Sequence, residues 1–137
     1  MRASFIAIYG GVALGCGTAA PEVEAPVTVS TTVLTVGPGN LEAYGSNRHL
    51  LALALRDGGP RLVLADLEAG TARELPWPLD PEATCDHVVP AGGQVCAAGY
   101  DAGAACVPAG GSGPPQPIPL AAPPTGLAWA DGALWIA

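Results

Sequence analysis

Apolar runs of strand length alternate with turn-forming residues along the chain from residue 27 onward. The run at residues 49–55 is almost continuously apolar, and the run at residues 27–36 is β-branched almost throughout, which favours strands. Clusters of Gly, Pro, Asn and Asp separate the runs, and such clusters end strands in tight turns. The strands expected from these runs lie at residues 27–36, 49–55, 61–67 and 71–75. The pattern therefore predicts an antiparallel meander.

A helix is the competing interpretation of residues 49–55, because Leu and Ala are good helix formers. The segment is shorter than an ordinary helix, and the sequence Asp-Gly-Gly-Pro at residues 57–60 interrupts it. We therefore predict a strand here.

The strand pattern recurs along the chain with a period of roughly 40–45 residues. Residues 93–98 align with residues 132–137, and residues 48–53 align with the first of these segments. Each copy follows a short strand and a turn, and these short strands are expected at residues 41–44, 86–89 and 127–129. Four short strands per repeat at this period are typical of the blades of a β-propeller.

The hairpin at residues 63–71 resembles those of bacterial YVTN and WD-repeat β-propellers, because its strand ends in Asp66 and Gly70 follows four residues later. Gly can adopt the left-handed turn conformation, and an Asp side chain can cap that turn. The resemblance extends over about residues 40–137. It implies an all-β fold in which residues 28–137 form an incomplete β-propeller of about two to three antiparallel blades. A small β-sandwich is the alternative.

Two positions of this hairpin indicate whether the chain resembles the propellers that bind pyrroloquinoline quinone. A pyrroloquinoline-quinone propeller has Thr before the Gly and Trp four residues after it, where this chain has Ala69 and Glu74. We therefore expect no cofactor.

The N-terminus has the pattern of an export signal. Met1 and Arg2 give a short positive start, and residues 3–14 form an apolar run. As a helix this run would span about 18 Å, well short of the ~30 Å hydrocarbon core of a bilayer, so a transmembrane helix is not expected. Residues 1–15 are instead predicted to be a signal peptide.

Residues 12–16 resemble the lipobox of bacterial lipoproteins, since a small residue precedes Cys16 at the end of the apolar run. The resemblance implies cleavage before Cys16, a diacylglycerol on its sulfur and an acylated amino terminus, with residues 16–27 as a flexible tether. By the family's sorting rule, Gly17 favours the outer membrane. The alternative is ordinary secretion after cleavage near residues 19–20, which gives a secreted or periplasmic product.

Charge excludes several classes of function. The chain has 12 acidic residues against 5 basic ones and a formal net charge of −7, so we do not expect nucleic-acid binding. All the basic residues are Arg, and a chain without Lys has neither a Walker-A phosphate loop nor a Schiff-base lysine. The hydrophobic share of 50% argues against a disordered chain.

Export makes disulfides permissible for the cysteines that follow Cys16. Cys96 and Cys106 flank a turn that is bounded by Gly on each side, and we favour a bridge between them. Cys85 and Cys96 flank a second turn, so a Cys85–Cys96 bridge is the alternative.

No metal site is predicted, although Cys85 and His87 lie two residues apart and would share a face of a strand. A thiolate and an imidazole suit zinc, but their spacing matches no familiar zinc motif. We interpret His87 and His49 as surface residues of strands.

No catalytic residue is predicted either. Residues 110–114 (Gly-Gly-Ser-Gly-Pro) resemble a nucleophile elbow only superficially, because Pro114 replaces the second Gly of that motif. They are interpreted as a linker.

Trp77, Trp129 and Trp135 would suit a carbohydrate-stacking surface, but packing between blades is the interpretation that we favour.

Together these features predict a bacterial cell-envelope lipoprotein with a propeller-like binding or scaffolding domain and no catalysis in this segment. Its expected partners are the membrane, through the lipid anchor, and a protein or carbohydrate ligand. The alternatives are part of a propeller hydrolase or lactonase, and a secreted β-domain without an anchor. Because the sequence stops within an apolar strand at residues 134–137, we expect the chain to be a fragment.

Overall fold

The computed structural model describes residues 4–10, 26 and 29–137, and these residues form strands and turns without any helix. Every strand pair is antiparallel, which confirms the all-β class. The strands are β1 (Ser4–Gly10), β2 (Val29–Thr35), β3 (Asn40–Asn47), β4 (Leu50–Arg56), β5 (Pro60–Asp66), β6 (Thr71–Leu75), β7 (His87–Ala91), β8 (Gln94–Gly99), β9 (Gly103–Pro108), β10 (Gln116–Ile118), β11 (Leu127–Ala130) and β12 (Ala133–Ile136). The helix alternative for residues 49–55 is wrong, because this segment forms β4.

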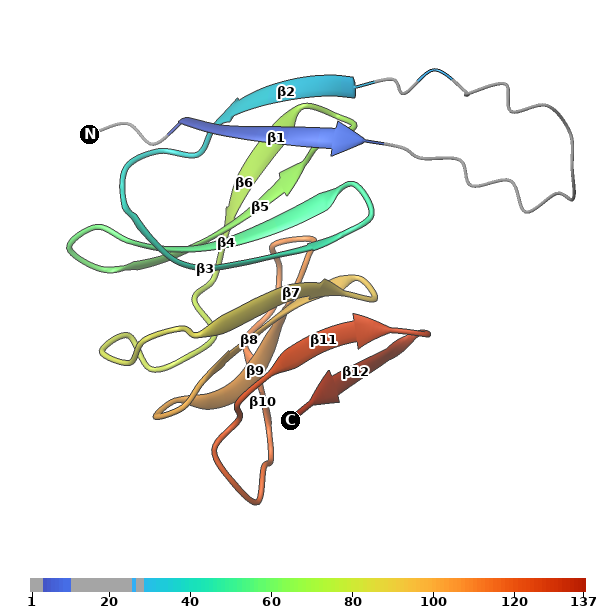
Figure 1. The fold of residues 1–137 in the computed structure, drawn as a ribbon. Helices are drawn as coiled ribbons and strands as arrows, with labels where there is room; N and C mark the ends of the chain where they lie inside the picture. Colours follow the sequence, from blue (N-terminus) through green and yellow to red (C-terminus); the bar gives the residue numbers. More distant parts are fainter. Residues whose placement is uncertain (1–3, 11–25, 27–28) are drawn as a thin grey trace, which may run out of the picture.

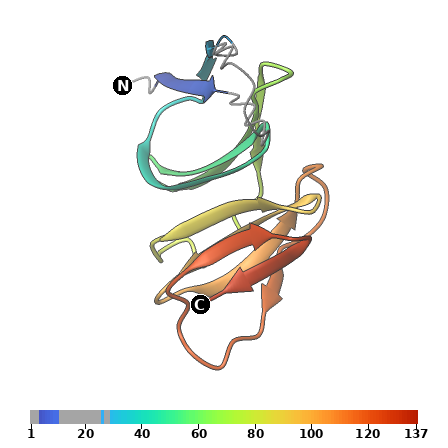
Figure 2. The same cartoon turned by 45° about the vertical axis from the view of Figure 1, so that its right-hand side comes forward.

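The described strands make four sheets, and strands that are consecutive in sequence are neighbours within each sheet. β3–β6 and β7–β10 are four-stranded meanders, whereas β1–β2 and β11–β12 are two-stranded. Figures 1 and 2 show the sheets following one another in chain order. The connections from β6 to β7 and from β10 to β11 therefore pass from one sheet to the next, and the four-stranded unit recurs along the chain.

The central strands of the β3–β6 sheet are buried on both faces. Ala52 and Ala54 of β4 belong to a cluster shared with the β7–β10 sheet, whereas Leu53 and Leu55 belong to a second cluster on the opposite face. This division follows from the strand geometry, in which successive side chains point to opposite faces. It explains why residues 49–55 are almost continuously apolar, since a strand between two packed layers has no solvent-facing side.

The largest core lies between the β3–β6 and β7–β10 sheets. Leu62 and Leu64 pack there with Val95 and Val107, and several of the other members are alanines. Small side chains let two sheets approach closely. One close approach involves Gly45 of β3, where a Cβ atom would lie 1.9 Å from the carbonyl oxygen of Val88 in β7.

Polar contacts tie the connection between β6 and β7 to the β3–β6 sheet. The Arg56 guanidinium pairs with the Glu42 carboxylate and donates to the carbonyl oxygens of Pro81 and Ala83, at 2.8 Å each. The other Glu42 oxygen accepts the backbone N–H of Cys85 at 3.2 Å. Hydrogen bonds to charged groups are the stronger kind, so this pair holds the connection in place.

The hairpin that carries the propeller resemblance has the capped turn expected from its sequence. One Asp66 carboxylate oxygen accepts the backbone N–H groups of Glu68 and Ala69 at 3.0 Å each. Gly70 has a φ of 68° and donates its N–H to the carbonyl oxygen of Asp66. The Asp and the Gly therefore act together to close the turn.

The Gly45 contact predicts a specific sensitivity to substitution. Gly45→Ala places a methyl group against the Val88 carbonyl, so the two sheets must separate, and we expect the protein to lose about 1–3 kcal/mol of unfolding free energy or more. Urea unfolding measures this loss. Gly110→Ala is the matched control, because a Cβ atom at Gly110 meets no atom within 4 Å. Equal stability of the two variants would contradict the close packing.

Candidate functional site

The predicted lipidation site, Cys16, lies outside the described residues, as does most of the predicted signal peptide and tether. Of the signal peptide, the structure describes Ser4–Gly10, which forms β1 and pairs with β2. Within the described part of the chain, no helix has the length and apolar character needed to cross a membrane. The signal peptide and the lipid anchor stay predictions.

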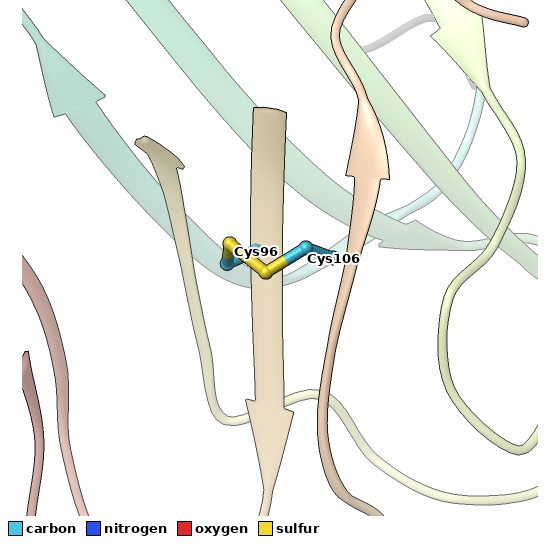
Figure 3. The surroundings of a disulfide bond; sticks show 2 residues. All are labelled: Cys96 and Cys106. Atoms are coloured by element: carbon cyan, nitrogen blue, oxygen red, sulfur yellow. A yellow bond between two sulfur atoms is a disulfide. The ribbon is translucent and has the colours of Figure 1, made fainter. Parts of the chain in front are cut away.

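Cys96 and Cys106 are joined by a disulfide, which Figure 3 shows between β8 and β9. The two residues are directly opposite in the register of these strands, with their Cα atoms 4.0 Å apart. Both are buried in a cluster with Val89 and Ala91, against which Trp129 packs from the next sheet. The bridge therefore lies beneath the surface on which β11 rests.

Cys85 is the remaining described cysteine, and it is a buried free thiol. Its Sγ donates to the carbonyl oxygen of His87 at 3.3 Å. Burial raises the pKa of the Cys85 thiol to about 12, and the nearby Glu42 carboxylate adds to the rise. The raised pKa keeps the group as a thiol and disfavours the thiolate, which is the form that attacks as a nucleophile.

The other residues singled out from the sequence are scattered over the fold. Within the described residues, no group of three or more His, Cys, Asp or Glu side chains has a metal-binding arrangement. Ser112 lies in the exposed connection between β9 and β10. Trp77 packs against the main core, Trp129 packs against the β7–β10 sheet, and the Trp135 side chain is 60% exposed. Inter-sheet packing thus accounts for two of the three tryptophans.

The first strands of three successive sheets lie side by side and form a groove. β7 contacts both β3 and β11, as Figures 1 and 2 also show. The groove has a volume of about 270 Å³, and we call it the inner-strand groove. The residues that line it include Tyr44, Ser46, His87, Val89, Leu127 and Trp129.

A larger depression of about 580 Å³ lies where the hairpin turns that follow these first strands come together. We call it the turn basin. It takes residues from the β3–β4, β7–β8 and β11–β12 turns, and its side chains with hydrogen-bonding groups are Asn47, Arg48, His49, Gln94, Trp129 and Asp131. Trp129 lines both depressions, so the groove and the basin adjoin at this residue.

Left-handed backbone conformations shape the rim of the turn basin. Arg48 and Asp131 have φ values of 54° and 53°, and Gly92 and Gly93 have φ values of 55° and 82°. Non-glycine residues rarely adopt positive φ, and such values at both turn residues give the tight hairpin turns that follow the twist of the strands. The β7–β8 and β11–β12 turns have positive φ at both turn residues, whereas the β3–β4 turn has it at Arg48 and not at His49.

Asn47 and His49 place polar groups along one wall of the basin. Asn47 Nδ2 donates to the carbonyl oxygen of Pro90 at 3.3 Å, which ties β3 to β7. The two ring nitrogens of His49 lie 3.8 Å from carboxylate oxygens of Asp66 and Glu68. The imidazole thus lies near two carboxylates at the edge of the basin, at distances longer than a hydrogen bond.

The sequence interpretation missed most of the basin. Of the basin side chains it singled out His49 and Trp129, but not Asn47, Gln94 or Asp131. The repeat alignment contains the missing signal, because it places the turns of the three repeats at equivalent positions. The alignment does not show that these equivalent turns lie close together in the folded chain.

Comparison of the chain with protein-family models, curated proteins and solved structures finds no match.

The disulfide predicts a stability difference that depends on the redox state. The bridge spans 10 residues of sequence, so reduction or the double variant C96A/C106A should cost about 2–3 kcal/mol of unfolding free energy. Thermal unfolding with and without a reducing agent measures this effect. Cys85→Ala is the control and should keep the full response to the reductant. Loss of that response in Cys85→Ala would instead indicate that Cys85 forms the bridge.

Proposed function

We propose that this chain belongs to an exported cell-envelope lipoprotein whose propeller-like sheets form a binding domain without catalysis. The anchor would be Cys16, and the ligand would bind where the turns of successive sheets meet. The proposal combines the N-terminal sequence with the geometry of the described sheets.

The succession of sheets supports a propeller-like arrangement. Each four-stranded meander runs from its first strand to its last, and the chain then crosses to the first strand of the next sheet. The first strands are neighbours, since β7 contacts both β3 and β11. A β-sandwich has two facing layers, whereas here at least three sheets follow one another, as blades do around an axis.

The turn basin is the observation that carries the binding function. It is the larger of the two adjoining depressions, and equivalent turns of three successive sheets build it. Repeated units typically form binding surfaces from equivalent positions of neighbouring units. Its volume of about 580 Å³ falls within the range of small-molecule sites, roughly 300–1,000 Å³.

The anchor is supported by the residues before the sheets. An apolar run of signal-peptide length ends at Cys16, and residues 16–27 lack strand or helix periodicity. Several acyl chains on one cysteine would give durable attachment to a membrane. The formal net charge of −7 would keep the domain away from anionic lipid head groups.

Membrane fractionation of a Cys16→Ser variant tests the anchor. In a Gram-negative host supplied with labelled palmitate, the wild-type chain should incorporate label and sediment with the membranes. Cys16→Ser removes the acylated sulfur, so it should lose the label and leave the membrane fraction.

Cys85→Ala provides the matched cysteine control, because it leaves Cys16 in place and should behave as the wild type does. Unlabelled wild-type protein, or a Cys16→Ser variant that is still fully membrane-bound, would contradict the anchor.

A further inference from the structure

Trp129 offers a fixed aromatic surface at the junction of the two depressions. Its ring is half-buried and rests on the backbone at Gly92, where a Cβ atom would lie 2.8 Å from Cη2 of the indole. Together with Leu127, it also packs against the cluster of the β7–β10 sheet that contains the disulfide. The indole is therefore held in one place, and Trp129 lines both the groove and the basin.

The polar groups of the basin supply both donors and acceptors. Gln94 carries an amide that donates and accepts, the Arg48 guanidinium only donates, and the Asp131 carboxylate only accepts. Asn47 uses its Nδ2 group on the Pro90 carbonyl, which leaves its Oδ1 as an acceptor. A ligand matched to this set must itself donate and accept, and a sugar hydroxyl does both.

Charge and composition narrow the class of ligand further. The basin is lined by one Arg and one Asp, and the chain as a whole is acidic. The described residues that line the inner-strand groove include no Asp, Glu or Arg. Their polar side-chain groups are the hydroxyls of Tyr44 and Ser46, the imidazole of His87 and the indole N–H of Trp129. A phosphate or a polyanion would find little positive charge here to balance its own charge. An uncharged polyhydroxylated ligand needs no such balancing charge.

We propose that the turn basin and the inner-strand groove bind a neutral saccharide, with Trp129 as the platform on which a sugar ring stacks. This inference rests on the proposed binding function and names its ligand. The apolar face of a pyranose lies on the indole, and its equatorial hydroxyls hydrogen-bond to Gln94 and Asn47. A following sugar ring extends along the groove past Tyr44, whose side chain is 69% exposed.

Calorimetric titration of the whole chain with cellotriose, maltotriose and chitotriose tests the proposal. At least one of these trisaccharides should bind, and Gln94→Ala should weaken that binding by about two- to tenfold, the loss expected for one hydrogen bond. Gln116→Ala is the matched control, because Gln116 is an exposed Gln on β10 outside both depressions. Its affinity should equal that of the wild type.

A second pair of variants tests the stacking platform. Trp129→Ala should weaken binding more than about tenfold, whereas Trp135→Ala, on the same hairpin but outside both depressions, should leave the affinity unchanged. If Trp129→Ala fails to fold, the comparison of Gln94→Ala with Gln116→Ala still tests the saccharide proposal. Absence of heat with all three sugars, or equal affinities of the Gln94→Ala and Gln116→Ala variants, would overturn the saccharide proposal. Because the membrane anchor is measured separately through Cys16, that result would leave the lipoprotein proposal standing.

Discussion

The close approach of the β3–β6 and β7–β10 sheets at their first strands governs the arrangement of this chain. At Gly45 the backbone of β3 lies against the Val88 carbonyl of β7, with no room for a Cβ atom between them. Alanines on the facing strands keep the rest of the interface narrow, and Leu62, Leu64, Val95 and Val107 fill it. A larger side chain at the contact would separate the sheets and open the core, because protein interiors are close-packed and yield little.

The depressions follow from this contact between strands. When β3, β7 and β11 lie side by side, the turns that follow them end at the same edge of the molecule, and their residues surround the turn basin. The disulfide and its neighbours form the surface beneath Trp129, so the core of the second sheet also supports the candidate site. Structural and binding roles therefore overlap at this indole, which packs on one side and lines the depressions on the other.

Local features of the fold could be predicted from the sequence, whereas contacts between sheets could not. The strands at residues 49–55 and 61–67 and the Asp66 turn are set by neighbouring residues, so apolar runs and turn formers locate them. The favoured partners Cys96 and Cys106 are opposite one another because a short turn fixes the register of β8 and β9. Gly45 gives no such local signal, since its role depends on a carbonyl more than forty residues away. For the same reason, composition did not distinguish half-buried Trp129 from exposed Trp135.

The most direct test of this account is the distance between β3 and β7 at Gly45 in solution. In an isotope-labelled chain, nuclear Overhauser effects between the Gly45 α-protons and the backbone protons of Val88 and Val89 report this contact. We expect strong effects here, because Val88 and Val89 backbone atoms border the Cβ position of Gly45. Their absence in a folded chain whose β3–β4 and β7–β8 pairings are intact would show that the two sheets are not packed in this way.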